Sequence, residues 1–212
     1  MLRVSHLSCS RGHKPLFADV NFQVQPGQAL HLAGDNGVGK TSLLRIVCGL
    51  SAADAGEVHW HTQTIGHNPA AYRASLFYVG HALSLKDDET ALENLLSDAA
   101  IAGRTLTPTQ ALSALARMGL RGREHLPLRV MSQGQKRRTA LARLLTTQAP
   151  LWVLDEPFVA LDANAVDELR VLIAAHLAQG GLVLFTSHQP VTLTQADGTA
   201  IDVPTYRLKA AA

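Results

Sequence analysis

The most informative segment of this chain reads Gly34-Asp35-Asn36-Gly37-Val38-Gly39-Lys40-Thr41 and fits the pattern G-x-x-x-x-G-K-[ST]. In such a loop the glycines let backbone N–H groups approach phosphate oxygens, the lysine reaches the β- and γ-phosphates, and the last hydroxyl ligates Mg²⁺. The flanks fit, because residues 29–33 are typical of a short strand and residues 41–48 of an apolar helix ended by Gly49. The segment predicts a nucleotide phosphate site with Mg²⁺; a glycine-rich turn without a ligand is the alternative. Ser42, the next residue, is included among the predicted phosphate-site residues, although packing at the helix start is favoured for it over contact with a ligand.

Composition narrows the class of protein. The chain has 212 residues, of which 47% are hydrophobic and 5% aromatic, so we expect one domain, residues 1–212, with a core of Leu, Val and Ala. A formal net charge of +2 is too small to indicate nucleic acid as a partner. Cys9 and Cys48 share no metal or redox spacing and are expected to be reduced thiols. No run approaches the roughly 18 apolar residues of a membrane span, and residues 1–6 lack the apolar core of a signal peptide. Any action at a membrane is therefore expected to pass through partners.

Strands are predicted from alternating and all-apolar runs. Residues 2–7 and 20–24 alternate in the manner of edge strands, with a turn-rich segment at 10–15 between them. Residues 53–56 are expected to form a loop and residues 58–61 a short strand. Further along, residues 76–79 are typical of a compact strand, and two runs are typical of strands buried on both faces of a parallel sheet: 151–154 and 182–185.

Helical periodicity replaces this pattern between residues 88 and 123. Two sets of apolar residues are spaced for helix faces: Leu92, Leu95 and Leu96, then Ala111, Leu112, Leu115 and Met118. Pro108, between the two sets, fits a helix start. We therefore expect an α/β fold with a mainly parallel core, an antiparallel β edge and an inserted helical subdomain at roughly residues 86–135.

Two adjacent acids, Asp155 and Glu156, follow the apolar run 151–154. A buried strand that delivers two carboxylates at its end suits phosphoryl transfer, with Asp155 holding Mg²⁺ directly or through water beside the Thr41 hydroxyl. Glu156 is then expected to polarise or position the attacking water. Paired acids at a strand end can also be solvated surface groups, and the phosphate loop is what favours the catalytic interpretation.

A second candidate anion site lies at Met131-Ser132-Gln133-Gly134-Gln135. Ser132 and Gln135 have the spacing of a capping box, so a helix should begin there with free backbone N–H groups. Considered alone, this segment is better explained as an ordinary capped helix.

Together these motifs resemble the nucleotide-binding subunits of ATP-binding-cassette (ABC) transporters, which are P-loop NTPases. Residues 131–135 resemble the family's L-S-G-G-Q signature, with Met131 for leucine and Gln133 for the first glycine. The acid pair resembles the Walker B motif, Ala160-Leu161-Asp162 the D-loop, and Thr186-Ser187-His188 the strand end with the switch histidine. The resemblance covers nearly the whole chain in the family's order. It implies the ABC cassette fold and ATP hydrolysis with Mg²⁺.

The same resemblance implies how two copies assemble and which residues act. Two cassettes pack head to tail, each ATP lying between one phosphate loop and the partner's signature helix, here Ser132, Gln133, Gly134 and Gln135. Lys40 and Glu156 are implied to serve catalysis. His188 is implied to contact the γ-phosphate, and Asp162 to couple the two sites.

Two positions depart from the family's pattern. The aromatic residue that stacks on adenine is missing near Arg11, whose guanidinium plane can stack instead, with Phe17 as a weaker candidate. After the strand at 76–79 the family has glutamine, and this chain has His81, which can donate or accept a hydrogen bond near Mg²⁺ and water. Adenine selectivity and the contribution of His81 stay open at this point.

Within the family, the closest resemblance is to the branch that serves cytochrome c maturation, also described as haem exporter ATP-binding subunits. It is carried by Gly80-His81, by the segments 90–95, 131–138 and 154–162, and by Thr186-Ser187-His188-Gln189. It implies a peripheral subunit on the cytoplasmic face of the inner membrane that works with integral membrane subunits. ATP hydrolysis is then implied to release a haem-loaded chaperone, with the segment 88–123 and the His81 loop as the docking surface.

Other functions remain as alternatives. Ten histidines raise the possibility of a haem site at His59, His61 and His67, but no apolar pocket is predicted there, so haem is expected as an indirect partner. An ABC subunit for another cargo would carry the same motifs. A soluble ABC ATPase acting on ribosomes or DNA usually has two cassettes or a coiled-coil insertion, and this sequence has neither.

Overall fold

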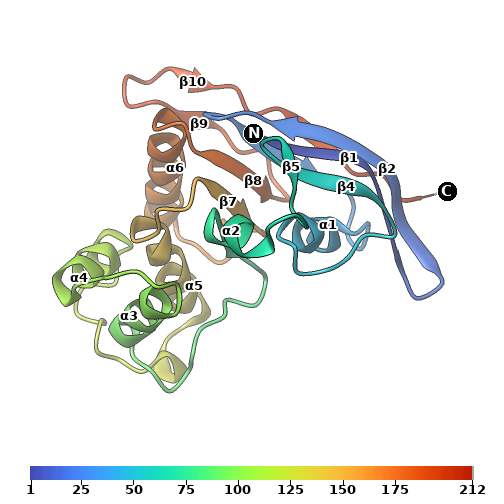
Figure 1. Cartoon of the computed structure of the whole chain (residues 1–212). Helices are drawn as coiled ribbons and strands as arrows, with labels where there is room; N and C mark the ends of the chain where they lie inside the picture. The colour runs from blue at the N-terminus through green and yellow to red at the C-terminus, as the bar shows by residue number, and fades with distance from the viewer. Residues whose placement is uncertain (212) are drawn as a thin grey trace.

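A five-stranded parallel sheet forms the centre of the molecule (Figure 1). The computed structural model describes residues 1–211, and the strand order is β11-β3-β8-β7-β6, with every neighbouring pair parallel. The strands are β3 (Ala29–Ala33), β6 (Leu76–Val79), β7 (Leu151–Leu154), β8 (Leu182–Thr186) and β11 (Thr205–Arg207). The carboxyl ends of β3, β7 and β8 therefore meet at one edge of the sheet, which is where open α/β sheets bind ligands.

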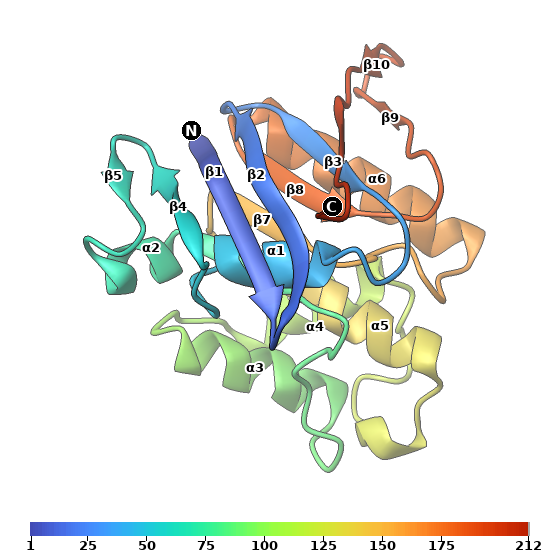
Figure 2. The same ribbon diagram turned by 90° about the vertical axis from the view of Figure 1, so that its right-hand side faces the viewer.

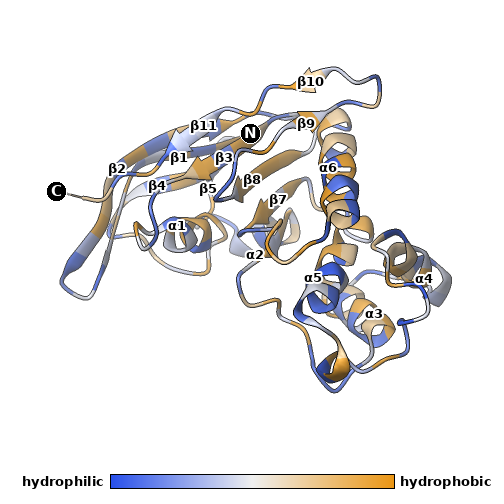
Figure 3. Cartoon of the chain, turned by 180° about the vertical axis from the view of Figure 1, so that it is seen from behind, coloured by the Kyte–Doolittle hydropathy of each residue, from blue (hydrophilic) through white to orange (hydrophobic). Residues whose placement is uncertain are grey.

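Strands β7 and β8 are buried on both faces, and this prediction is confirmed. Leu151 and Val153 pack on one side with α1 (Lys40–Val47). Trp152 and Leu154 pack on the other side with α6 (Ala163–Ala178). Because neither face meets water, the strands need no alternation of apolar and polar residues, and Figure 3 shows both as apolar along their length.

A four-stranded antiparallel sheet, in the order β2-β1-β4-β5, packs on the other side of α1 (Figure 2). Its strands are β1 (Leu2–Arg11), β2 (Lys14–Val24), β4 (Ala55–Trp60) and β5 (Gln63–Thr64). This sheet is the predicted antiparallel edge, and α1 lies between it and the parallel core.

Two predicted boundaries in this sheet are wrong. The strands continue through most of the segment 10–15, because Gly12, at φ 62°, closes a two-residue turn and lets Arg11 pair with Lys14. Strand β4 begins inside the segment 53–56, which was expected to be a loop. Gly56 (φ 83°) makes this possible, since a Cβ there would lie 2.3 Å from the carbonyl oxygen of His6.

In the sequence, the remaining helices all come between strands β3 and β7 of the core. They are α2 (Pro69–Ala74), α3 (Ala91–Ile101), α4 (Pro108–Arg117), α5 (Gln133–Ala142) and the short 3₁₀ helices η1 (Leu128–Val130) and η2 (Arg143–Leu145). Thr90 and Thr107 begin α3 and α4 with complete capping boxes, and Pro108 occupies the first turn of α4. Helices α3 and α4 lie apart from both sheets (Figure 1). The assignment of residues 86–135 as an inserted subdomain stays a prediction.

The C-terminal residues bind the core next to the phosphate loop. After the small hairpin of β9 (Leu193–Thr194) and β10 (Ala200–Ile201), strand β11 pairs with β3. The N–H of Leu208 then donates to the carbonyl of Ala33 (2.8 Å), and the N–H of Ala211 donates to the carbonyl of Leu16 (3.1 Å). Residues 208–211 thus connect the end of β3, next to the phosphate loop, to strand β2.

Three further observations bear on function. Within residues 1–211, no helix has the length and apolar character needed to cross a bilayer, and no cluster of His, Cys, Asp and Glu side chains is arranged to hold a metal ion on its own. Cys9 and Cys48 are both free thiols. Burial raises the pKa of Cys48 to about 12, so this thiol is a packing group and not a nucleophile at neutral pH.

His176, near the end of α6, is held between two neighbours. Its ring stacks on Trp152 with centroids 3.8 Å apart, its Nε2 lies 3.2 Å from the carbonyl oxygen of Pro150, and burial lowers its pKa. A Cβ on buried Gly181 would lie 2.2 Å from His176 Nε2. Since the ring is already stacked, it cannot move aside to admit a side chain at this position.

We therefore expect Gly181→Ala to lower the free energy of unfolding by about 1–3 kcal/mol through overpacking, measured as a shift in the urea midpoint. Gly66→Ala is the matched control, because a Cβ at Gly66 meets no atom within 4 Å, and its effect should stay within about 0.5 kcal/mol. Equal midpoints for the two variants would contradict the packing argument.

Candidate nucleotide site

The phosphate loop connects the end of β3 to the start of α1. Gly34, Gly37 and Gly39 have φ angles of 151°, 78° and 108°, which favour glycine. Space imposes the same choice, because a Cβ on Gly39 would lie 3.0 Å from the ring of Phe17. No side chain caps the N-terminus of α1, so its first N–H groups remain available to an anion.

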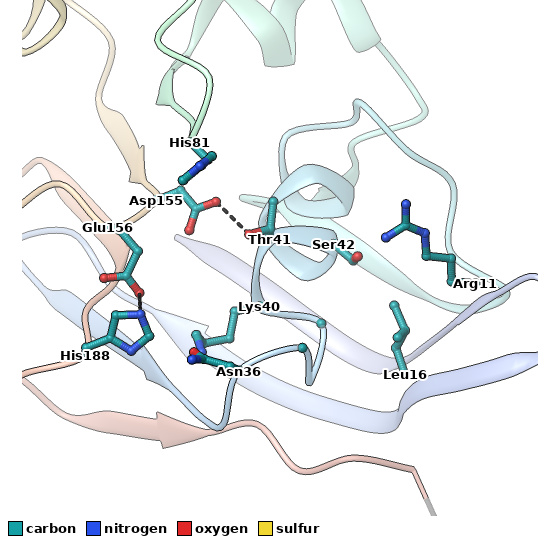
Figure 4. A pocket seen from close by; sticks show the side chains of 12 residues that line it. Arg11, Leu16, Asn36, Lys40, Thr41, Ser42, His81, Asp155, Glu156 and His188 are labelled. Atoms are coloured by element: carbon teal, nitrogen blue, oxygen red, sulfur yellow. Dashed lines mark hydrogen bonds and ion pairs between the residues drawn. The ribbon is translucent and has the colours of Figure 1, made fainter. Parts of the chain in front are cut away.

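The loop borders an open cleft of about 270 Å³ (Figure 4). The cleft is lined by Arg11, Leu16, Asn36, Gly37, Gly39, Lys40, Thr41, Ser42, His81, Asp155, Glu156 and His188. Most of the predicted site residues are thus brought together, including Ser42, for which packing was favoured. Gly34, Asp35 and Val38 instead line hollows outside this cleft.

Lys40 lies over the loop. Its Nζ donates to the carbonyl oxygens of Gly34 (2.7 Å) and Asp35 (3.1 Å), and it makes no ion pair with a carboxylate in the described part of the chain. The ammonium charge is therefore not neutralised by the protein, which suits it to phosphate oxygens.

Asp155 is the most tightly held acid of the site. The residue is 2% exposed, and its carboxylate accepts hydrogen bonds from the hydroxyls of Thr41 and Thr186, each at 2.8 Å. The Thr186 hydroxyl also accepts a hydrogen bond from the N–H of Glu156 at 2.8 Å. A hydroxyl and a carboxylate at this spacing are oxygen ligands of the kind that Mg²⁺ takes, so the residues present fit that ion.

Glu156 is placed differently from its neighbour. Its backbone has φ 51°, a left-handed value that is uncommon outside glycine and that marks functional sites in many proteins. Its Oε1 is buried without a hydrogen-bond partner among residues 1–211, and it lies 3.6 Å from Nε2 of half-exposed His188. Figure 4 shows this oxygen directed at the His188 ring. Because it accepts no hydrogen bond from the protein, it can accept one from a water molecule.

Arg137, on α5, binds the backbone of both acids and was not identified from the sequence. Its guanidinium donates to the carbonyl oxygen of Asp155 at 3.0 Å and to that of Glu156. Burial lowers the pKa of Arg137, while the two carboxylates act in the opposite direction. One arginine among several in a basic helix carries no sequence signal for this contact.

The signature segment forms the capped helix start that the sequence predicts. Ser132 Oγ accepts from the N–H of Gln135 (3.2 Å), and Gln135 Oε1 accepts from the N–H of Ser132 (2.9 Å). A Cβ on Gly134 would lie 2.8 Å from the carbonyl oxygen of Ala160, so glycine is needed where α5 meets the D-loop. Gln133 is exposed, and none of these residues lines the cleft of its own chain.

Asp162 has a local structural contact. It caps α6 by accepting a hydrogen bond from the N–H of Ala165 at 3.0 Å, and its other oxygen lies 3.7 Å from Arg138. The D-loop is thus tied to both α6 and α5.

The two departures from the family pattern lie at different ends of the cleft. His81 is exposed and lies near Asp155, whereas Arg11 lies on the hairpin beside Leu16 (Figure 4). Phe17, considered as a stacking partner for a base, is wrong in that role: its side chain is 1% exposed and packs under the loop. Leu16, its neighbour on β2, faces the cleft instead, and strand alternation alone places the two side chains on opposite faces.

Comparison with known proteins agrees with the family indicated by the sequence motifs. The family model described as ABC transporter matches residues 17–159. The chain belongs to the ABC transporter family. This ABC protein is therefore an ATPase of the ABC type, as the sequence predicts.

Relatives of this ABC ATPase match it over most of its length. The cytochrome c biogenesis ATP-binding export protein CcmA of Nitrosomonas europaea is 47% identical over 194 residues, covering 92% of this chain and 91% of that protein. CcmA of Albidiferax ferrireducens is 50% identical, covering 91% of each chain. CcmA of Escherichia coli O157:H7 is 44% identical, covering 92% of this chain and 93% of the relative.

Solved structures share the fold of this ABC ATPase. A putative ABC transporter ATP-binding protein from Pyrococcus furiosus has a TM-score of 0.81 at 23% identity, covering 98% of this chain and 96% of that one. The ATP-binding cassette MJ0796, in a dimeric post-hydrolysis state bound to ADP and Pi, has a TM-score of 0.80 at 22% identity, covering 89% and 88%. The predicted ABC cassette fold is confirmed.

The role of the Thr186 hydroxyl in positioning the two acids can be tested by substitution. Thr186→Val keeps the shape of the side chain and removes the hydroxyl that Asp155 and Glu156 share. We expect the free energy of unfolding to fall by about 1–3 kcal/mol. ATP hydrolysis should be roughly tenfold slower, because both acids lose a positioning contact. Thr139→Val is the matched control: Thr139 is equally buried, but its hydroxyl bonds only to the carbonyl of Gln135. If both variants slow hydrolysis alike, the effect is one of stability and Thr186 does not position the acids.

Proposed function

We propose that this ABC ATPase is the ATP-hydrolysing subunit of a membrane complex for c-type cytochrome biogenesis, where it energises haem delivery through release of a haem-loaded chaperone. The observation that carries the proposal is the 44–50% identity to three proteins named CcmA over 91–92% of this chain. The cleft, which brings together Lys40, Thr41, Asp155 and Glu156, supports the ATP-hydrolysing part of the proposal. Haem is an indirect partner, and the chain acts from the cytoplasmic face of the inner membrane as a peripheral subunit.

The cleft binds the phosphates of ATP through the loop. The backbone N–H groups of residues 36–40 and the Lys40 ammonium contact the β- and γ-phosphates, with Asn36, Gly37, Gly39 and Ser42 lining their path. Thr41 and Asp155 hold Mg²⁺, which supplies positive charge that neutralises the phosphate oxygens. The hydrogen bond between these two side chains brings the ligands together before the ion arrives.

Glu156 acts on the attacking water. Its unpartnered Oε1 accepts a hydrogen bond from that water and then its proton, while the water oxygen bonds to the γ-phosphorus and the bond to the β–γ bridging oxygen breaks. His188, 3.6 Å away, contacts the γ-phosphate and helps to orient the carboxylate. His81 lines the same end of the cleft, where it can contact water near Mg²⁺.

Two copies complete each site. The helix start at residues 132–135 does not line its own cleft, and a head-to-tail homodimer presents it to the ATP of the partner subunit. Asp162, tied to both α5 and α6, then connects the two sites. Dimeric structures of the cassette MJ0796 support this arrangement.

The membrane subunits dock near the helical segment. A hollow between β6 and α3 is lined by Phe77, by Ile101, which is 81% exposed, and by Arg73, Asp98 and Arg104. An exposed apolar side chain beside a surplus of arginine fits a cytoplasmic loop with an apolar residue and an acidic one.

An ABC subunit for another cargo is the alternative within the same class, and a soluble ABC ATPase is the alternative from a different class. The cleft is the same in all three, so the cellular role of ATP hydrolysis has to separate them.

We expect Glu156→Gln to bind ATP as the unchanged protein does and to hydrolyse it at least about a hundredfold more slowly, because the amide cannot accept the proton of the water. Phosphate release and nucleotide binding are measured on the same preparation. Glu57→Gln is the control, since Glu57 is exposed and is not among the residues that line the cleft. A slowing of less than about tenfold would remove Glu156 as the base.

The same variant tests the cellular role. In cells whose only copy carries Glu156→Gln at normal expression, haem staining of c-type cytochromes should be lost while apocytochrome is still exported. Normal staining would sink the biogenesis role and leave an ABC ATPase for another cargo or a soluble one.

Dimer formation is tested with Ser132→Arg. The larger charged side chain should block closure on the partner's ATP. We expect Glu156→Gln, which hydrolyses ATP slowly, to form a dimer with ATP in sizing experiments, and we expect that dimer to be absent from the double variant. Gln133→Arg places the same charge on the next, exposed residue and reports how specific the effect is to Ser132. A persistent dimer in the Ser132 variant would argue against the head-to-tail arrangement.

A further inference from the structure

The two ends of the cleft differ in chemistry (Figure 4). Glu156 and His188 lie at one end, and Arg11 and Leu16 at the other, beyond Ser42. A nucleotide with its γ-phosphate beside Glu156 and its β-phosphate on the loop extends its base toward Arg11 and Leu16. The inference below rests on the proposed nucleotide site and concerns which base this end accepts.

The base end offers no aromatic surface. No Phe, Tyr or Trp side chain of residues 1–211 lines the cleft, and Phe17 is buried beneath the loop. Leu16 is the apolar contact, and the hydrogen bond from Ala211 to its carbonyl holds it in place. Because stacking on an aromatic ring is missing, the polar edge of the base gains weight in binding.

Arg11 is the polar group at this end. Its guanidinium makes no ion pair within the described residues, and the two acids that line the cleft, Asp155 and Glu156, lie at the far end. A guanidinium only donates hydrogen bonds, and its planar fork matches two adjacent acceptors.

Purine bases differ in what they offer to such a fork. Guanine presents two adjacent acceptors, N7 and O6, whereas adenine presents the acceptor N7 beside the donor N6. We propose that the cleft accepts guanosine triphosphate at least as well as adenosine triphosphate, with Arg11 as the base-contacting residue that donates to guanine N7 and O6. The triphosphate and Mg²⁺ are then recognised strictly, and the base is not selected for adenine.

The test measures displacement of trinitrophenyl-ATP from the full-length protein by ATP, GTP and ITP in the presence of Mg²⁺. ITP keeps N7 and O6 but lacks the 2-amino group of guanine, so GTP and ITP should behave alike. Both should bind about one to ten times as tightly as ATP, since an exposed contact yields only part of the discrimination of a buried one.

Arg11→Gln is the decisive variant, because glutamine offers one donor and one acceptor and so matches N7 and N6 of adenine. It should shift the GTP-to-ATP affinity ratio toward ATP by at least about threefold. Lys14→Gln removes the same charge from the same hairpin at a residue outside the cleft lining, and it should leave the ratio unchanged.

Two results overturn the proposal: weaker binding of GTP than of ATP by the unchanged protein, or the same affinity ratio in Arg11→Gln as in Lys14→Gln. Failure of the nucleotide site itself is distinguishable. In that case no triphosphate displaces the probe, or Lys40→Ala binds all three nucleotides as the unchanged protein does.

Discussion

The carboxylate of Asp155 is the group on which the arrangement of the site depends. It is almost fully buried, and a buried charge without partners is costly, so its two hydrogen bonds to Thr41 and Thr186 are a structural requirement. These bonds join three elements that meet at one edge of the sheet: the start of α1, the end of β7 and the end of β8. The phosphate loop, the proposed Mg²⁺ ligands and Glu156 are positioned by the same contacts.

Helix α5 extends this network toward the surface that we propose to face a second copy. Its first turn begins with the capping box of Ser132 and passes Gly134 against the D-loop carbonyl, and one turn later Arg137 holds the carbonyls of Asp155 and Glu156. The segment that we assign to the partner's ATP and the clamp on the chain's own acids are therefore parts of one rigid helix. A displacement of α5 would reach both sites without an intermediate loop.

The two ends of the cleft differ in how firmly the protein holds their side chains. At the phosphate end, glycine turns shape the loop and buried hydrogen bonds hold Asp155 and the Thr41 hydroxyl. At the other end, Arg11 and Leu16 lie on a hairpin held by a two-residue turn and by the C-terminal residues. Binding energy in such a cleft comes chiefly from the charged phosphates, which is the physical basis for expecting weak selection of the base.

Much of this could be read from local sequence. The phosphate loop, the capping box at Ser132, the start of α4 at Pro108 and the doubly buried strands depend on residues a few positions apart, so their patterns determined them and led to the ABC family. Only the tertiary structure decided that Thr186 bridges the two acids, that Arg137 clamps them and that Phe17 is buried while Leu16 faces the cleft. Thr41 and Asp155 are 114 positions apart, and such contacts depend on strand order and on the direction of side chains at the sheet edge, which local patterns do not contain.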